Sequence, residues 1–141
     1  AICNKEKNMR TLFFLFILIF LSSKVKSQEH FLLPDSPAKC HLIKEGKFIK
    51  NGESAKKWNI VIKKDSQKEY TNNGKDYIKY KIEFLDNCTY KTTVTGKSGG
   101  KNSVRIGDVM TNRIIETDHQ FIKISSKYFN KTDEIILEKI E

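Results

Sequence analysis

The chain has few of the residues that usually carry out a reaction. Among its 141 residues there are only three histidines, three cysteines, one tryptophan and two prolines. His30, His41 and His119 share no ligand spacing, and neither a Cys-x-x-Cys nor a paired-histidine motif occurs, so the sequence predicts no metal site. No serine or cysteine nucleophile has an identifiable base beside it. We therefore expect a protein that is not an enzyme and needs no cofactor.

Arginine is also scarce, although Lys and Arg together number 26 and the formal net charge is +9. Only Arg10, Arg105 and Arg113 carry a guanidinium, the group best suited to bidentate binding of phosphate or guanine. The Gly- and Lys-rich run 96–102 lacks the spacing of a phosphate-binding loop and is predicted to be an ordinary loop. These features argue against a nucleic-acid partner.

Only one long apolar run occurs, Leu12–Leu21, and it is shorter than the roughly 20 residues of a membrane-spanning helix. A basic residue precedes it, and small residues ending at Ser27 follow it, the pattern of a secretory signal peptide. We expect residues 1–8 to be upstream read-through and residues 9–27 to be the signal peptide. The mature protein would then begin near Gln28, be exported to the periplasm or the extracellular space, and keep no transmembrane anchor. An uncleaved N-terminal anchor is the alternative.

The remaining chain divides into an exposed lead-in over residues 28–39, which contains both prolines, and a single domain over residues 40–141. This domain contains two cysteines, Cys40 and Cys88. An isolated pair in an oxidising compartment usually forms a disulfide. A metal site or a catalytic thiol is the alternative, and we predict the disulfide.

Period-two alternation of apolar and polar residues dominates the domain and is typical of half-buried strands. It is clearest over Tyr77–Phe84, and a second run over Cys88–Val94 follows a predicted turn at Asp86–Asn87, so the two form an antiparallel hairpin. A turn is also predicted at Asn72–Gly74. Further strands are expected over residues 58–63, before Tyr70, and over 104–106, 109–117, 120–126 and 134–140, with a helix over 133–141 as the alternative for the last.

This pattern predicts an all-β fold, an antiparallel meander of about seven or eight short strands that forms a small lipocalin-like barrel or half-barrel. Gln67 and Glu69 share one face of a strand. They face outward if the face of Trp58 continues in register, and inward if a turn at Asp65–Ser66 resets it. Inward polar groups are what a ligand site needs, whereas a solvated hairpin is the alternative. The candidate ligand-facing residues are Trp58, Gln67, Glu69, Tyr80 and Tyr90, although core packing explains both tyrosines more simply.

Several short motifs are similar to those of small exported proteins of Bacteroidota-type bacteria whose function is uncharacterised. The motifs are an early cysteine before Gly-Lys-Phe, a basic residue before Gln-x-Glu, and an aromatic strand end before Cys-x-Tyr, here Cys40, Gly46-Lys47-Phe48, Gln67-Lys68-Glu69, Phe84 and Cys88-Thr89-Tyr90. The resemblance implies a shared fold and compartment but no activity. Some members carry a topoisomerase label, for which this sequence has neither a tyrosine nucleophile context nor an acidic metal cluster.

Two functions fit these observations. The first is a monomeric exported binding domain whose partner is a small amphiphilic or hydrophobic ligand or an envelope component. The second is a structural or protein-interaction module of the cell envelope, with a filled core and an envelope protein as its partner. A hollow barrel favours the first function and a packed barrel favours the second.

Overall fold

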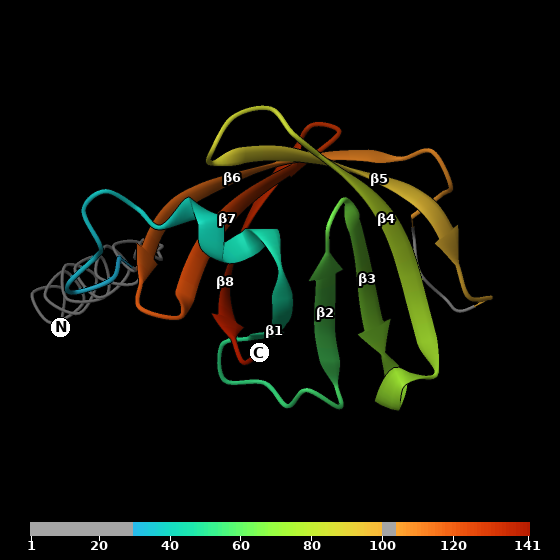
Figure 1. Ribbon diagram of the computed structural model, residues 1–141. Helices are drawn as coiled ribbons and strands as arrows, with labels where there is room; N and C mark the ends of the chain where they lie inside the picture. Colours follow the sequence, from blue (N-terminus) through green and yellow to red (C-terminus); the bar gives the residue numbers. More distant parts are fainter. Residues whose placement is uncertain (1–29, 100–103) are drawn as a thin grey trace, which may run out of the picture. The chain divides into compact units, whose positions relative to one another are not determined.

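Eight strands and two short 3-10 helices make up most of the part of the chain that the computed structural model describes, residues 30–99 and 104–141 (Figure 1). The predicted signal peptide and its cleavage site lie outside these residues. In chain order the elements are η1 (Cys40–Lys44), β1 (Gly46–Lys50), β2 (Trp58–Lys63), β3 (Ser66–Thr71), η2 (Asn72–Gly74), β4 (Asp76–Phe84), β5 (Thr89–Lys97), β6 (Val109–Asp118), β7 (Phe121–Tyr128) and β8 (Lys131–Lys139).

Each strand pairs antiparallel with the next, and β8 returns to β1, so the meander closes into a barrel. The predicted all-β barrel is therefore confirmed, as are the hairpin of β4 and β5 and its turn. Asp86 holds that turn because its Oδ1 accepts hydrogen bonds from the backbone N–H groups of Cys88 (2.8 Å) and Thr89 (2.7 Å). The predicted turn at Asn72–Gly74 is also present, and all three of its residues have positive φ.

Three local predictions were wrong or incomplete. Residues 104–106 form no strand, because the backbone N–H of Arg105 is bound at 2.8 Å by the Asp108 carboxylate and Gly107 turns the chain with φ 96°. The last segment is a strand as predicted, but β8 begins at Lys131, earlier than expected. The domain begins with the short 3-10 helix η1, for which the sequence analysis gave no element.

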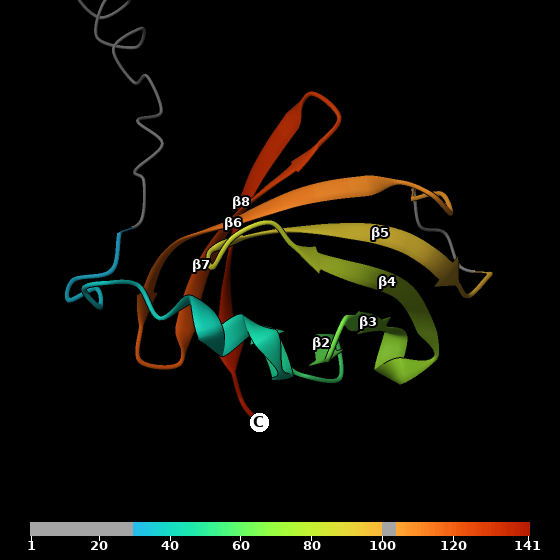
Figure 2. The ribbon, with the colours of Figure 1, turned by 45° about the horizontal axis from the view of Figure 1, so that its top comes forward.

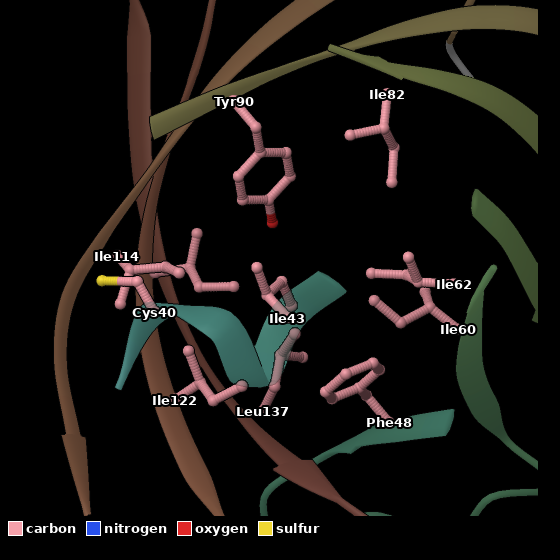
Figure 3. Close-up of a cluster of buried hydrophobic side chains, with 11 residues drawn as sticks. Cys40, Ile43, Phe48, Ile60, Ile62, Ile82, Tyr90, Ile114, Ile122 and Leu137 are labelled. Carbon is pink, nitrogen blue, oxygen red and sulfur yellow. The ribbon is translucent and has the colours of Figure 1, made fainter. Parts of the chain in front are cut away.

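The barrel has two ends that differ in what closes them. We call the end that carries η1, the β4–β5 turn and the β6–β7 turn the closed end. In Figures 1 and 2, η1 lies beneath the arch formed by β5, β6 and β7. Ile43 of η1 is fully buried and lies among the apolar side chains of the barrel wall, as Figure 3 shows. The buried members of this cluster are Cys40, Ile43, Phe48, Ile60, Ile62, Ile82, Tyr90, Ile114, Ile122, Ile124 and Leu137.

The segment before η1 is fixed to the barrel at the closed end. Leu32 is 97% exposed, but Asp35 donates its backbone N–H to the Thr117 carbonyl at 2.7 Å and accepts the Thr117 hydroxyl at 2.8 Å. The backbone N–H of Lys39 donates to the same hydroxyl oxygen, also at 2.8 Å. These bonds hold the entrance of η1 to β6. Among the described residues, no helix combines the length and apolarity that crossing a membrane requires.

The opposite end, which we call the open end, carries the β1–β2, β3–β4, β5–β6 and β7–β8 connections. Strand β8 is paired with its two neighbours over different lengths. It pairs with β7 over Lys131–Glu138 but with β1 only over Leu137–Lys139. Figure 2 shows the tip of the β7–β8 hairpin standing clear of the neighbouring strands.

Candidate functional site

A cavity of about 130 Å³ occupies the part of the barrel toward the open end. All five residues predicted to face a ligand line it together. The full lining is Trp58, Ile60, Gln67, Glu69, Tyr80, Tyr90, Thr92, Met110, Asn112, Ile124, Ser126, Ile135 and Leu137. Pockets for drug-sized ligands measure about 300–1,000 Å³, whereas an engineered apolar cavity of about 150 Å³ binds benzene. The space therefore suits one small molecule or one group of a larger one.

The inward direction of Gln67 and Glu69 follows from the length of the β2–β3 turn. The turn consists of Lys64 and Asp65, and Lys64 takes a positive φ of 57°. It places Ile62 opposite Gln67 and Ile60 opposite Glu69. Residues directly opposite each other on antiparallel strands share a face, so both polar side chains join the buried isoleucines inside the barrel. The turn lies one residue earlier than the position that the sequence indicated.

Glu69 is the charged residue of the cavity, and two aromatic side chains hold it in place. Its Oε1 accepts a hydrogen bond from Trp58 Nε1 at 2.8 Å, and its Oε2 accepts one from the Tyr80 hydroxyl at 2.9 Å. Burial, and then the negative charge of Glu69, raise the pKa of the Tyr80 hydroxyl far above its ordinary value of 10.0. No lysine, arginine or histidine among the described residues forms an ion pair with Glu69.

A second polar group lies on the facing wall. Asn112 is only 6% exposed, and its Nδ2 donates to Thr92 Oγ1 at 3.1 Å. The Ser126 hydroxyl donates to Asn112 Oδ1 at 2.7 Å. These bonds join β5, β6 and β7 across the wall of the cavity. A buried polar network that is satisfied in this way fixes the positions of its members.

Two more residues that line the cavity also have polar side-chain groups. Neither the Gln67 carboxamide nor the Tyr90 hydroxyl has a hydrogen-bond partner among the described residues. Burial raises the pKa of Tyr90 above its ordinary value of 10.0. Figure 3 shows the Tyr90 hydroxyl pointing into the barrel, toward Ile43. A ligand in the cavity can therefore bond to the Gln67 carboxamide without breaking an existing hydrogen bond there.

The sequence analysis missed Asn112, Ser126 and Lys50. Asn112 could have been found, because it lies two residues before Ile114 on a predicted strand and so interrupts an apolar face. Lys50 lies on the same face of β1 as the buried Phe48, and its Nζ sits 4.7 Å from the centroid of the Trp58 ring. Lys50 does not line the cavity, so we place it beside the site.

The two cysteines form the predicted disulfide, which joins η1 to the β4–β5 turn across 48 positions of sequence. This pairing confirms the disulfide over the metal and thiol alternatives for Cys40 and Cys88. In the described part of the chain, no group of three or more His, Cys, Asp and Glu side chains is arranged to hold a metal ion.

No protein-family model, curated protein or solved structure matches this chain. The resemblance to small exported bacterial proteins therefore remains a prediction.

Proposed function

We propose that this protein is an exported binding domain that receives a small amphiphilic ligand, or one small group of an envelope component, in the open half of its barrel. The observation that carries the proposal is the clustering of polar groups with fixed positions and aromatic rings around one cavity. Inward positions of a barrel that serve only stability are expected to be filled by apolar side chains.

The lining indicates how such a ligand would bind. Trp58, Tyr80 and Tyr90 supply aromatic surface, and Met110 and Leu137 supply aliphatic surface. The polar groups described above would fix the orientation of the ligand. A purely hydrocarbon ligand fits poorly, because it would remove the Glu69 carboxylate from water without giving it a new hydrogen bond. A ligand with both apolar and polar parts can contact the apolar side chains and form hydrogen bonds with the polar ones.

The disulfide supports the proposal of export, since such bonds form and persist mainly in oxidising compartments. It does not distinguish the periplasm from the extracellular space.

A second candidate function is a structural or protein-interaction module of the cell envelope. The observation that favours it is the apolar packing of the closed half of the barrel around the fully buried Ile43. In that case the cavity would hold only water, and partners would bind to the outer surface.

Trp58 allows a direct test, because it is the sole tryptophan of the chain and lines the cavity. We expect at least one member of a set of small alcohols, amines and carboxylic acids with short alkyl groups to change its fluorescence saturably and raise the melting temperature. The variant Gln67→Phe should abolish both effects, because the ring fills the cavity and the lost amide has no partner among the described residues.

The matched control is Thr111→Phe, which places the same ring on the exposed face of β6 and should leave binding unchanged. If no compound of the set gives a saturable signal while circular dichroism shows folded protein, the filled-core module becomes the better account.

A further inference from the structure

The carboxylate of Glu69 has hydrogen-bonding capacity that the two aromatic donors do not use. An ionised carboxylate offers about four lone-pair sites, and Trp58 and Tyr80 occupy two of them. Glu69 lines the cavity, so a ligand can approach its remaining sites. A partly buried carboxylate is stabilised by a cationic partner, which the described residues do not supply through an ion pair.

The aromatic residues that line the cavity also favour a positively charged ligand. The faces of tryptophan and tyrosine rings attract cations, and Trp58 already shows this through the Lys50 ammonium, 4.7 Å from its ring centroid. Tyr80 and Tyr90 line the cavity beside it. A carboxylate that is bonded by Trp58 and Tyr80 and shares its cavity with Tyr90 is suited to an organic ammonium, whose charge is neutralised by the carboxylate while its hydrocarbon part contacts the apolar lining. A small inorganic cation instead requires several oxygen ligands arranged around it.

The other charges near the cavity argue against an anionic ligand. Lys50 is the cation that contacts the Trp58 ring, but it does not line the cavity. An anion bound within the cavity would therefore meet the charge of Glu69 before it met that of Lys50. An anion bound at Lys50 would lie outside and leave the Glu69 carboxylate without a partner. Between the two kinds of charged ligand, a cation is therefore the one that lowers the electrostatic energy at Glu69.

We infer that the ligand of the cavity is a small organic cation, an ammonium that carries a short apolar group and binds with its charge on Glu69. This inference rests on the proposed function and names the ligand class for the same site. The volume of about 130 Å³ limits the ligand, or the part of it that enters, to a few carbon atoms beyond the charged group.

The test compares three probes of nearly equal size and shape: butylammonium, n-butanol and butyrate. Each is titrated into the purified protein while NMR follows the indole N–H of Trp58, which is hydrogen-bonded to Glu69. We expect butylammonium to bind at least tenfold more tightly than n-butanol, a difference of about 1.4 kcal/mol. Butyrate should bind no more tightly than n-butanol. Added salt should weaken only the binding of butylammonium.

The variant Glu69→Gln keeps the shape of the side chain and removes its charge. It should lower the affinity for butylammonium about tenfold and leave that for n-butanol nearly unchanged. The control Glu83→Gln removes a carboxylate that is 64% exposed on the outer face of β4, and should change neither affinity. Because the comparison of the three probes needs only the unaltered protein, it decides the question even if Glu69→Gln folds poorly.

The outcomes separate this inference from the proposed function. Equal affinities for butylammonium and n-butanol, or an equal loss of both in Glu69→Gln, would overturn the cationic ligand and leave a binding cavity in place. If none of the three probes binds, and the wider set of amphiphiles also fails, both proposals are overturned.

Discussion

The two halves of this barrel are built by the same strands but differ in the side chains that they place inside. At the closed end, Ile43 and Phe48 are fully buried, and isoleucines from several strands fill the space around them. Toward the open end, the inward positions include a carboxylate, two amides and four hydroxyl-bearing side chains, and a cavity remains between them. The same strands run through both halves, so the difference comes from the sequence of inward-facing residues along each strand.

β6 and β7 show this change most clearly. The inward face of β6 passes from Asn112 to Ile114, and that of β7 passes from Ser126 to Ile124 and Ile122 as the strands run between the open and the closed end. A functional site is best held by a rigid scaffold, and polar groups at such a site commonly cost stability. We therefore assign stability mainly to the closed half and recognition to the open half, and the following measurements test that division.

The largest effect is expected from removing the disulfide at the closed end. The double variant Cys40→Ala, Cys88→Ala opens a loop of 48 positions, and the chain-entropy model gives a loss of about 4 kcal/mol. Urea unfolding followed by circular dichroism measures this loss. The unaltered protein under reducing conditions is the control and should unfold at a similar denaturant concentration. A loss below about 1 kcal/mol would mean that the bond contributes little to the stability of the closed half.

Truncating the side chain that fills the closed end is expected to have the next largest effect. Ile43→Ala should lower the free energy of unfolding by about 3 kcal/mol, because it leaves a cavity among well-packed neighbours. The control Ile115→Ala removes the same atoms from an exposed position on β6 and should cost less than about 0.5 kcal/mol. Equal effects of the two variants would show that η1 is not an essential part of the core.

In the open half, an apolar substitution should stabilise the protein and not destabilise it. Gln67→Leu is expected to raise the free energy of unfolding by about 0.5–1 kcal/mol, since it replaces an inward amide with no partner among the described residues by an apolar group of similar size. Thr111→Leu, on the outer face of β6, serves as the control. Destabilisation by Gln67→Leu would show that the polar lining contributes to stability and would weaken the division between the halves.

Protonating the aspartates of the turns in acid is expected to have the smallest effect on the free energy of unfolding. Hydrogen bonds from the backbone N–H groups of Cys88 and Thr89 hold the pKa of Asp86, at the closed end, below its ordinary value of 3.8. Because the pKa is lower in the folded state, ionised Asp86 stabilises the fold at any pH above its ordinary value of 3.8. This stabilisation is lost as the pH falls through the folded-state pKa. The difference in the free energy of unfolding between the unaltered protein and Asp86→Ala should therefore shrink in acid. A difference that is the same at neutral and acidic pH would contradict this.

Asp108 offers the matching measurement at the open end. The hydroxyl of Tyr128 donates to its Oδ2 at 2.5 Å, and this bond, more than that from the backbone N–H of Arg105, lowers the pKa of Asp108. Asp108→Asn should likewise reduce the acid sensitivity of unfolding. If it does so while Asp86→Ala does not, the acid-sensitive part of the barrel lies at the open end alone.

Local patterns predicted the strands well wherever alternation extended over many residues. The run Tyr77–Phe84 and its partner were identified because eight consecutive positions follow one period, and Asp86–Asn87 supplied turn residues. The cysteine pair was predicted because an exported chain rarely keeps two free thiols. By contrast, the short apolar run at residues 104–106 was mistaken for a strand, since three residues carry too little periodicity to distinguish a strand from a turn.

The candidate site could be predicted only in part. Whether Gln67 and Glu69 face inward depends on a single residue of turn length between β2 and β3, and a shift of one residue exchanges the two faces of a strand. The place of Ile43 inside the barrel depends on contacts with strands far along the chain, which no local pattern encodes. The bonds among Thr92, Asn112 and Ser126 likewise require three strands to be in register.

The short pairing of β1 with β8 bears on how fast a ligand could exchange. Leu137 belongs both to the β1–β8 pairing, the seam of the barrel, and to the cavity lining. Separating the two strands would therefore open the lining of the cavity at Leu137. Register pairing there covers only Leu137–Lys139, and backbone hydrogen bonds at Asn51 and Lys47 extend it. This is still a shorter contact than that of β6 and β7, which are paired from Met110 to Asp118. Amide protons along the seam should therefore exchange with solvent sooner than those between β6 and β7. The lifetime of a bound ligand would then be set by this local opening and not by unfolding of the whole barrel.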